Sequence, residues 1–181
     1  PGFSLGPFGQ YFTRQETWAE AGGKAWMAYL GRSCYLLQQG RNIADVLYLY
    51  GENNNITWIC REKLPSIPAG YEFDFVNSSA LLNAIQVKNG KLVAQSGNSY
   101  SVLVLDESTK FMTLPVLKKL RDLVKGGAKV IGAKPLKSPS LTDNAAEFQS
   151  IANEIWAHPN AAVETLHDVQ TLHDVQTLHD V

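Results

Sequence analysis

Hydrophobic positions near the start of the chain repeat with the period of an α-helix. Thr13 and Glu16 fit a capping box, in which a threonine oxygen accepts from one backbone amide and a glutamate from another. Apolar residues then recur at helical spacing, at Trp18, Ala25, Trp26, Tyr29, Leu30, Leu36 and Leu37. The pattern predicts a long helix that ends at Gly40, because glycine readily adopts the left-handed conformation of a helix stop.

Beyond this helix, short apolar runs predict strands. The runs at 45–50 and 101–105 are almost continuously apolar, which is typical of strands buried on both faces of a parallel sheet, and 128–132 predicts the next strand. Residues 72–76 alternate between apolar and acidic side chains and predict another strand. A hairpin is expected over 87–93, because Asn89-Gly90 suits a tight type I′ turn.

Helices are expected between these strands, over about 79–85, 114–125 and 143–157. Asn77 or Ser78 is expected to cap the first helix and Thr113 the second, while Gly126-Gly127 ends the second. Strands that alternate with helices predict an α/β fold. We therefore expect a flavodoxin-like three-layer domain with a parallel sheet and helices on both faces, into which the hairpin is inserted.

The last residues of the 181-residue chain form a repeat. Thr165–Gln170 recurs unchanged as 171–176 and again, without its last residue, as 177–181. A six-residue period would place the three repeated histidines on different sides of a helix, where they would not converge on one metal ion. The repeat therefore favours a low-complexity tail, disordered or frayed, over a metal site.

The composition of the chain excludes several kinds of partner and site. The net charge of -1 gives no electrostatic attraction to nucleic acid, and no apolar run has the length needed to cross a membrane. All four histidines lie at or after His158, so the predicted domain has neither a histidine-dependent triad nor a histidine zinc site. Cys34 and Cys60 are expected to be buried thiols, although a disulfide between them stays open.

One cluster of polar and aromatic side chains, before and within the first helix, has two interpretations. Glu16 fits the capping carboxylate, and Glu20 with Lys24 fits a solvated surface pair. The functional interpretation is a sugar subsite formed by Arg14, Trp18 and Glu20, in which a ring stacks on the sugar and charged groups bind its hydroxyls. Two carboxylates on one helix face cannot flank a glycosidic bond, so no catalytic pair is assigned here.

A second candidate site follows the strands at 45–50 and 101–105, where a doubly wound sheet usually binds its ligand. The polar residues there are Glu52, Asn53, Asp106, Glu107 and Ser108. The chain has no glycine-rich phosphate motif, and acidic loops repel phosphate. A flavin or nucleotide is therefore disfavoured, and no cofactor is expected in this chain.

Several motifs in the same order resemble the α-L-rhamnosidases of glycoside hydrolase family 106. They lie at residues 6–9, 12–18, 29–41, 44–52, 70–77, 100–105, 112–115 and 137–141. The resemblance covers about residues 1–157. It implies the end of a (β/α)8 catalytic barrel whose last helix is 14–39, followed by a flavodoxin-like or amidotransferase-like domain. It also implies hydrolysis of terminal rhamnose from plant or pectic glycans with inversion by two glutamates, and calcium at the active site.

The resemblance places most of the barrel before Pro1, so the catalytic residues of this chain are unknown. It implies substrate contacts by Arg14, Trp18 and Glu20, because they lie on the final barrel loop. The expected segments are 1–41 from the truncated barrel, 42–157 as the α/β domain and 158–181 as the tail.

Three hypotheses follow. In the first, the chain is an inactive piece of a bacterial glycoside hydrolase that acts in the periplasm or outside the cell, with carbohydrate as the partner of the parent enzyme. In the second, it is a self-contained module that binds a small ligand at the rim of Glu52 and Asp106. In the third, it is an oligomerisation domain, and a homo-oligomer forms.

Overall fold

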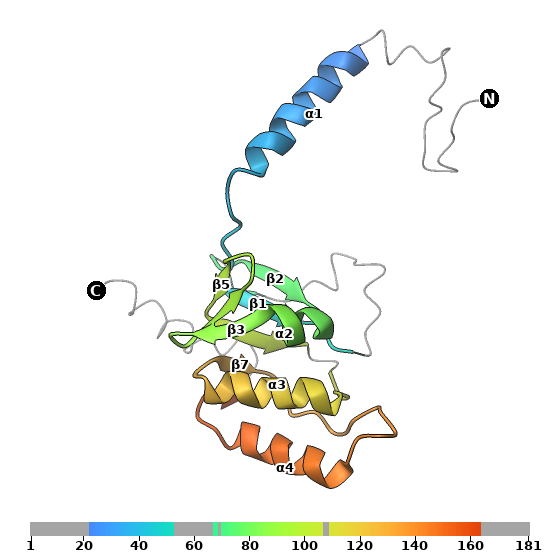
Figure 1. Cartoon of the computed structure of the whole chain (residues 1–181). Helices are drawn as coiled ribbons and strands as arrows, with labels where there is room; N and C mark the ends of the chain where they lie inside the picture. The colour runs from blue at the N-terminus through green and yellow to red at the C-terminus, as the bar shows by residue number, and fades with distance from the viewer. Residues whose placement is uncertain (1–21, 53–66, 69, 107–108, 164–181) are drawn as a thin grey trace, which may run out of the picture. The chain divides into compact units, whose positions relative to one another are not determined.

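The computed structural model describes residues 22–52, 67–68, 70–106 and 109–163 of the chain (Figure 1). The chain divides into two compact units, residues 1–42 and residues 43–181. The predicted tail, 158–181, lies outside the described residues from 164 onward, and so does the capping box at Thr13. The two units are described separately below.

The first unit contains helix α1, Lys24–Leu37. No residue of this helix is buried, and Cys34 is an exposed free thiol, so the expectation that it is buried was wrong. The helix ends at Leu37 and is capped by Gln38, whose amide donates to the carbonyl of Cys34 at 3.1 Å. Gly40 does not adopt a left-handed conformation, so the predicted glycine stop was also wrong.

The second unit is built on a five-stranded parallel sheet in the order β2-β1-β6-β7-β8. Its strands are β1 Val46–Leu49, β2 Phe73–Val76, β6 Val102–Leu105, β7 Lys129–Ile131 and β8 Ala161–Ala162. All residues of β1 and β6 are buried, as the continuous apolar runs predicted. The four predicted strands are therefore confirmed, and β8 is an addition to them.

Three helices of this unit match the predicted ones, namely α2 Ser78–Ala84, α3 Leu114–Lys125 and α4 Ala145–Trp156. Asn77 caps α2, because its side-chain oxygen accepts from the Ala80 amide at 2.7 Å. Asn144 caps α4 in the same way, at 3.0 Å from the Glu147 amide. Figure 1 shows α3 and α4 side by side against the sheet.

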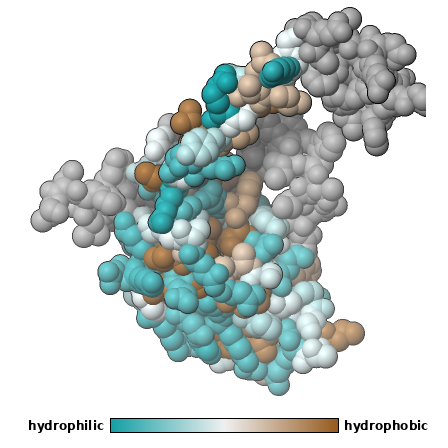
Figure 2. All heavy atoms as spheres, turned by 45° about the horizontal axis from the view of Figure 1, so that its top comes forward, coloured by the Kyte–Doolittle hydropathy of each residue, from teal (hydrophilic) through white to brown (hydrophobic). Residues whose placement is uncertain are grey.

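The core lies between these helices and one face of the sheet. Alternate strand residues such as Leu47, Leu103 and Val130 point into it, together with the buried sides of α2, α3 and α4. The other face carries a smaller cluster around Tyr48 and Val104. Within the described part of this unit, helices cover the first face only, so the predicted third layer is not confirmed. Figure 2 shows that the outer surface of this unit is mostly hydrophilic in that view.

A second, antiparallel sheet contains the predicted hairpin. Its strands are β3 Ile85–Lys88, β4 Lys91–Ala94 and β5 Ser99–Tyr100. Asn89 and Gly90 have φ values of 52° and 75°, as a type I′ turn requires. The Tyr100 hydroxyl donates to Asp74 of β2 at 2.9 Å, which links the two sheets. Burial, and then this hydrogen bond, raises the pKa of Tyr100 above its usual range.

Candidate functional site

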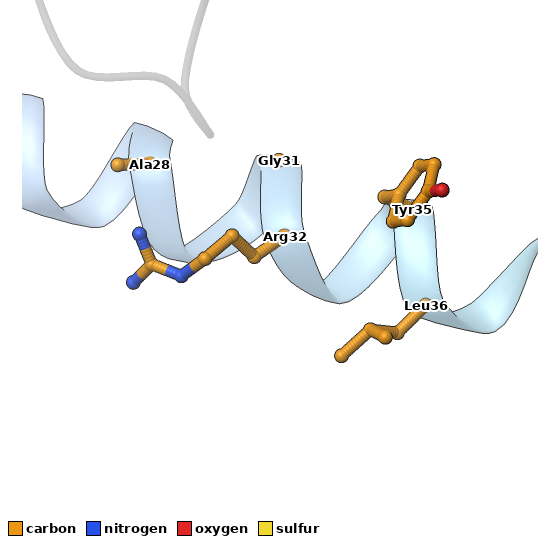
Figure 3. A pocket seen from close by; sticks show the side chains of 5 residues that line it. All are labelled: Ala28, Gly31, Arg32, Tyr35 and Leu36. Atoms are coloured by element: carbon orange, nitrogen blue, oxygen red, sulfur yellow. The ribbon is translucent and has the colours of Figure 1, made fainter.

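The predicted sugar subsite, Arg14, Trp18 and Glu20, lies outside the described residues, so it stays a prediction. The described helix of that unit, α1, carries a shallow hollow of about 570 Å³ along one side. Figure 3 shows its lining residues, Ala28, Gly31, Arg32, Tyr35 and Leu36. They all come from one helix and include a single charged side chain. They do not form a set of converging polar groups, which a specific ligand site requires.

The rim predicted after the first and third parallel strands does assemble. Strands β1 and β6 are neighbours, with Leu49 opposite Leu105. Asp106 follows β6 directly, and its amide donates to the carbonyl of Leu49 at 2.9 Å. Glu52 follows the same end of β1. Asn53, Glu107 and Ser108, which were also predicted for this rim, lie outside the described residues.

Glu52 binds the first turn of α3. One carboxylate oxygen accepts from the Thr113 amide at 2.6 Å, and the other accepts from the Thr113 hydroxyl at 3.0 Å. Thr113 was expected to cap α3 with its own side chain, but its hydroxyl makes no such bond. The hydroxyl instead donates to the Glu52 carboxylate, in a charge-assisted hydrogen bond.

Asp143, which no sequence pattern singled out, completes this arrangement. Its Oδ2 accepts from the Leu114 amide at 2.8 Å and from the Ser138 hydroxyl at 2.6 Å. The bond from Ser138, and then the bond from Leu114, lowers the pKa of Asp143 below its usual value. The only local signal for Asp143 was its position beside Asn144, the cap of the next helix.

The amides at the start of α3 are therefore engaged by carboxylates of the chain itself. A helix N-terminus is a ready anion site, because its free amides and the helix dipole favour negative charge. Here Glu52 and Asp143 occupy the amides of Thr113 and Leu114, and Pro115 has no amide hydrogen to offer. A phosphate at this position would have to displace two carboxylates.

Asp106 is engaged as well, since the Tyr48 hydroxyl donates to its Oδ2 at 2.7 Å. Within the described ranges, there is no group of three or more His, Cys, Asp or Glu side chains suited to a metal ion. The helices among those residues are also too short or too polar to span a bilayer. The rim is thus a set of carboxylates that bind the protein's own hydroxyls and amides.

Comparison with known proteins identifies the family. The family model described as alpha-L-rhamnosidase, glycoside hydrolase family 106, matches residues 1–180. The chain belongs to this family. The family 106 match also includes residues 158–180, which the resemblance seen in the sequence did not cover.

Two larger proteins resemble this family 106 chain. A protein of Formosa agariphila named "Putative beta-glucuronidase" is 42% identical over 159 residues, which are 86% of this chain and 13% of that protein. The solved rhamnosidase from Novosphingobium sp. PP1Y superposes with a TM-score of 0.71 and 33% identity, over 100% of this chain and 18% of that one. The chain thus spans less than a fifth of each relative.

Proposed function

We propose that this chain is part of a longer α-L-rhamnosidase and is inactive by itself. The observation that carries the proposal is the pairing of a family match over residues 1–180 with a span of only 13% and 18% of the two relatives. A chain of this size would then hold a supporting domain, while the reaction takes place in the remainder of the enzyme.

The structure of the second unit is consistent with a supporting domain. We propose that it is a flavodoxin-like domain, because its strand order has the 2-1-3-4-5 pattern when only the parallel strands are counted. A ligand of such a fold would bind beside β1 and β6, where Glu52 and Asp106 are already engaged. This occupancy weighs against the alternative of a self-contained ligand-binding module.

The apolar surface of α1, in the first unit, supports a partner domain that lies outside this chain. At 100° per residue, its apolar residues run from Tyr35 to Met27 over an arc of about 280° around α1, interrupted by Arg32 and Ser33, which is wider than the usual stripe of a surface helix. Trp26, Leu36 and Leu37 are between 56% and 82% exposed. We propose that α1 is the last helix of the catalytic barrel and that Arg14, Trp18 and Glu20 contact the sugar from its preceding loop.

The proposed reaction of the longer enzyme is removal of terminal rhamnose from plant or pectic glycans, with inversion by two glutamates. Inversion requires two carboxylates about 6.5–9.5 Å apart with water between them. No described acidic residue is assigned to that pair. Calcium does not fit the described residues, which lack a suitable cluster, so its ligands are assigned to the rest of the enzyme. Action on such glycans suits a periplasmic or extracellular enzyme.

A direct assay tests the proposal. The 181-residue chain should release no 4-nitrophenol from 4-nitrophenyl α-L-rhamnoside above the buffer rate, whereas the longer polypeptide encoded in the same reading frame should. The first sugar product, followed by proton NMR, should be β-rhamnose, since inversion changes the anomer. Turnover by the 181-residue chain would contradict the proposal, and so would a longer polypeptide without rhamnosidase activity.

A further inference from the structure

The connection between β7 and α4 exposes two leucines. We call residues 133–144 the leucine loop; it is the orange trace that swings out beside the start of α4 in Figure 1. Leu136 is 62% exposed, and Leu141 is as exposed as in an extended peptide, at 104%. The second unit buries its other leucines apart from partly covered Leu82, within the described residues. Exposed leucines on one loop are therefore a departure from its general pattern.

The base of the loop is held by backbone and side-chain bonds. The Leu136 amide donates to the carbonyl of Lys110 at 2.9 Å, and the Met112 amide donates to the carbonyl of Lys137 at 3.3 Å. The Gln149 side chain, from α4, donates to the carbonyl of Leu136 at 2.8 Å. Leu136 is thus fixed from two sides while its own side chain faces solvent.

The tip of the loop is fixed in the same way. Asp143 joins the Ser138 hydroxyl to the Leu114 amide, and the Ser140 amide donates to Ser138 Oγ at 3.0 Å. The hydroxyls of Ser140 and Thr142, on either side of Leu141, lie 2.9 Å apart. A contact that is ordered before binding loses less entropy when the complex forms. The loop therefore holds Leu141 in an ordered position before any partner binds.

The size of this contact indicates its occupant. Burying a leucine side chain removes about 60–120 Å² of apolar area from water. Two leucines fall far short of the roughly 800 Å² per partner that a stable complex between separate proteins buries. A covalently linked domain needs much less area, because the linker keeps its local concentration high.

We propose that the leucine loop docks into an apolar pocket on the catalytic domain of the same, longer polypeptide. The inference rests on the proposed function, in which more than four-fifths of the enzyme lies outside this chain, as in the two relatives. Leu136 and Leu141 then anchor the supporting domain to the part of the enzyme that carries the reaction.

Hydroxyl-radical footprinting, read by mass spectrometry, tests the docking on the longer polypeptide and on the 181-residue chain. Oxidation of Leu136 and Leu141 should be at least about fivefold slower in the longer polypeptide. In it, the double variant Leu136→Ser, Leu141→Ser should speed proteolytic separation of the two domains by a similar factor. The same variant in the 181-residue chain should keep the wild-type Tm, because both side chains are exposed there.

Each result decides the question. Equal oxidation in both polypeptides overturns the docking, and so does protection that appears only at concentrations where the longer polypeptide dimerises, since the occupant is then a second copy. The matched variant Val163→Ser, at an apolar residue 65% exposed outside the loop, should not speed separation. Rhamnosidase activity with unprotected leucines refutes this inference alone, whereas protected leucines without activity refute the proposed reaction.

Discussion

Among single residues, Gly132 stands out because it leaves little room for a side chain. It follows β7 with a φ of 140°, and an added Cβ would lie 2.7 Å from the Cβ of buried Leu105. Its amide donates to Ala162 at 2.9 Å, and its carbonyl accepts from the indole of Trp156 at 3.0 Å. One glycine therefore joins three elements at the edge of the sheet where the rim lies.

Gly132→Ala should lower the free energy of unfolding by roughly 2–4 kcal/mol, the combined effect of a strained backbone and an overpacked contact. Urea denaturation followed by circular dichroism measures it. The control is Gly31→Ala in α1, where no atom lies within 4 Å of the added Cβ. The control should leave the transition of the second unit unchanged, and equal effects of the two substitutions would refute the packing argument.

At the scale of elements, local signals predicted most of the fold, and long-range contacts account for what they missed. Strands β1 and β6 were visible as apolar runs, and α2 by its Asn77 cap, since both signals lie within a few residues. Strand β8 is Ala161–Ala162, which forms only by pairing with β7 and has no signature of its own.

The candidate rim shows the same limit. The sequence placed Glu52 and Asp106 at one edge, because parallel strands end together. It could not show that Glu52 would take the hydroxyl and amide of Thr113, 61 residues away. Nor could it show that Asp143 would reach Leu114, since helix capping signals concern the residues next to the helix. Because of those two contacts, we interpret the rim as carboxylates that hold the start of α3, and no longer as a ligand site.

The bonds of Asp143 predict a dependence on pH. Its pKa is lowered in the folded protein from the usual 3.8, so its stabilising effect is complete above the pKa of the unfolded chain. That effect is lost as the pH falls further, through the lowered pKa of the folded state.

Asp143→Asn should therefore reduce stability by a constant amount above about pH 5, and the difference in stability from wild type should disappear in stronger acid. Urea unfolding of both proteins between pH 7 and pH 2.5, two assay limits chosen around the usual Asp pKa, measures it. A gap independent of pH would contradict the assignment.

At the scale of the whole chain, the two units differ in how well they cover their apolar residues. Among its described residues, the second unit buries 28 hydrophobic ones, which lie between Ala44 and Ile155 and form two clusters. Helix α1 buries none of its residues and stacks Trp26 on Tyr29 at 5.5 Å between ring centroids. An apolar helix surface of this width is typical of an interface. Within the described residues, the second unit covers its own core, whereas α1 leaves its apolar surface exposed.

The 181-residue chain should therefore self-associate through α1, and light scattering at increasing concentration should show a mass above that of the monomer. Trp26→Gln with Leu37→Gln changes two neighbouring positions of the apolar arc, which are 56% and 82% exposed. Because each buried apolar side chain contributes about 1.5–3 kcal/mol, the double variant should weaken association by at least about tenfold.

The leucine-loop variant Leu136→Ser, Leu141→Ser is the matched control and should associate like wild type, since its two side chains cover too little area to hold separate chains together. A monomeric wild-type chain at every concentration would show that α1 needs no partner, and it would remove one of the supports for a missing barrel.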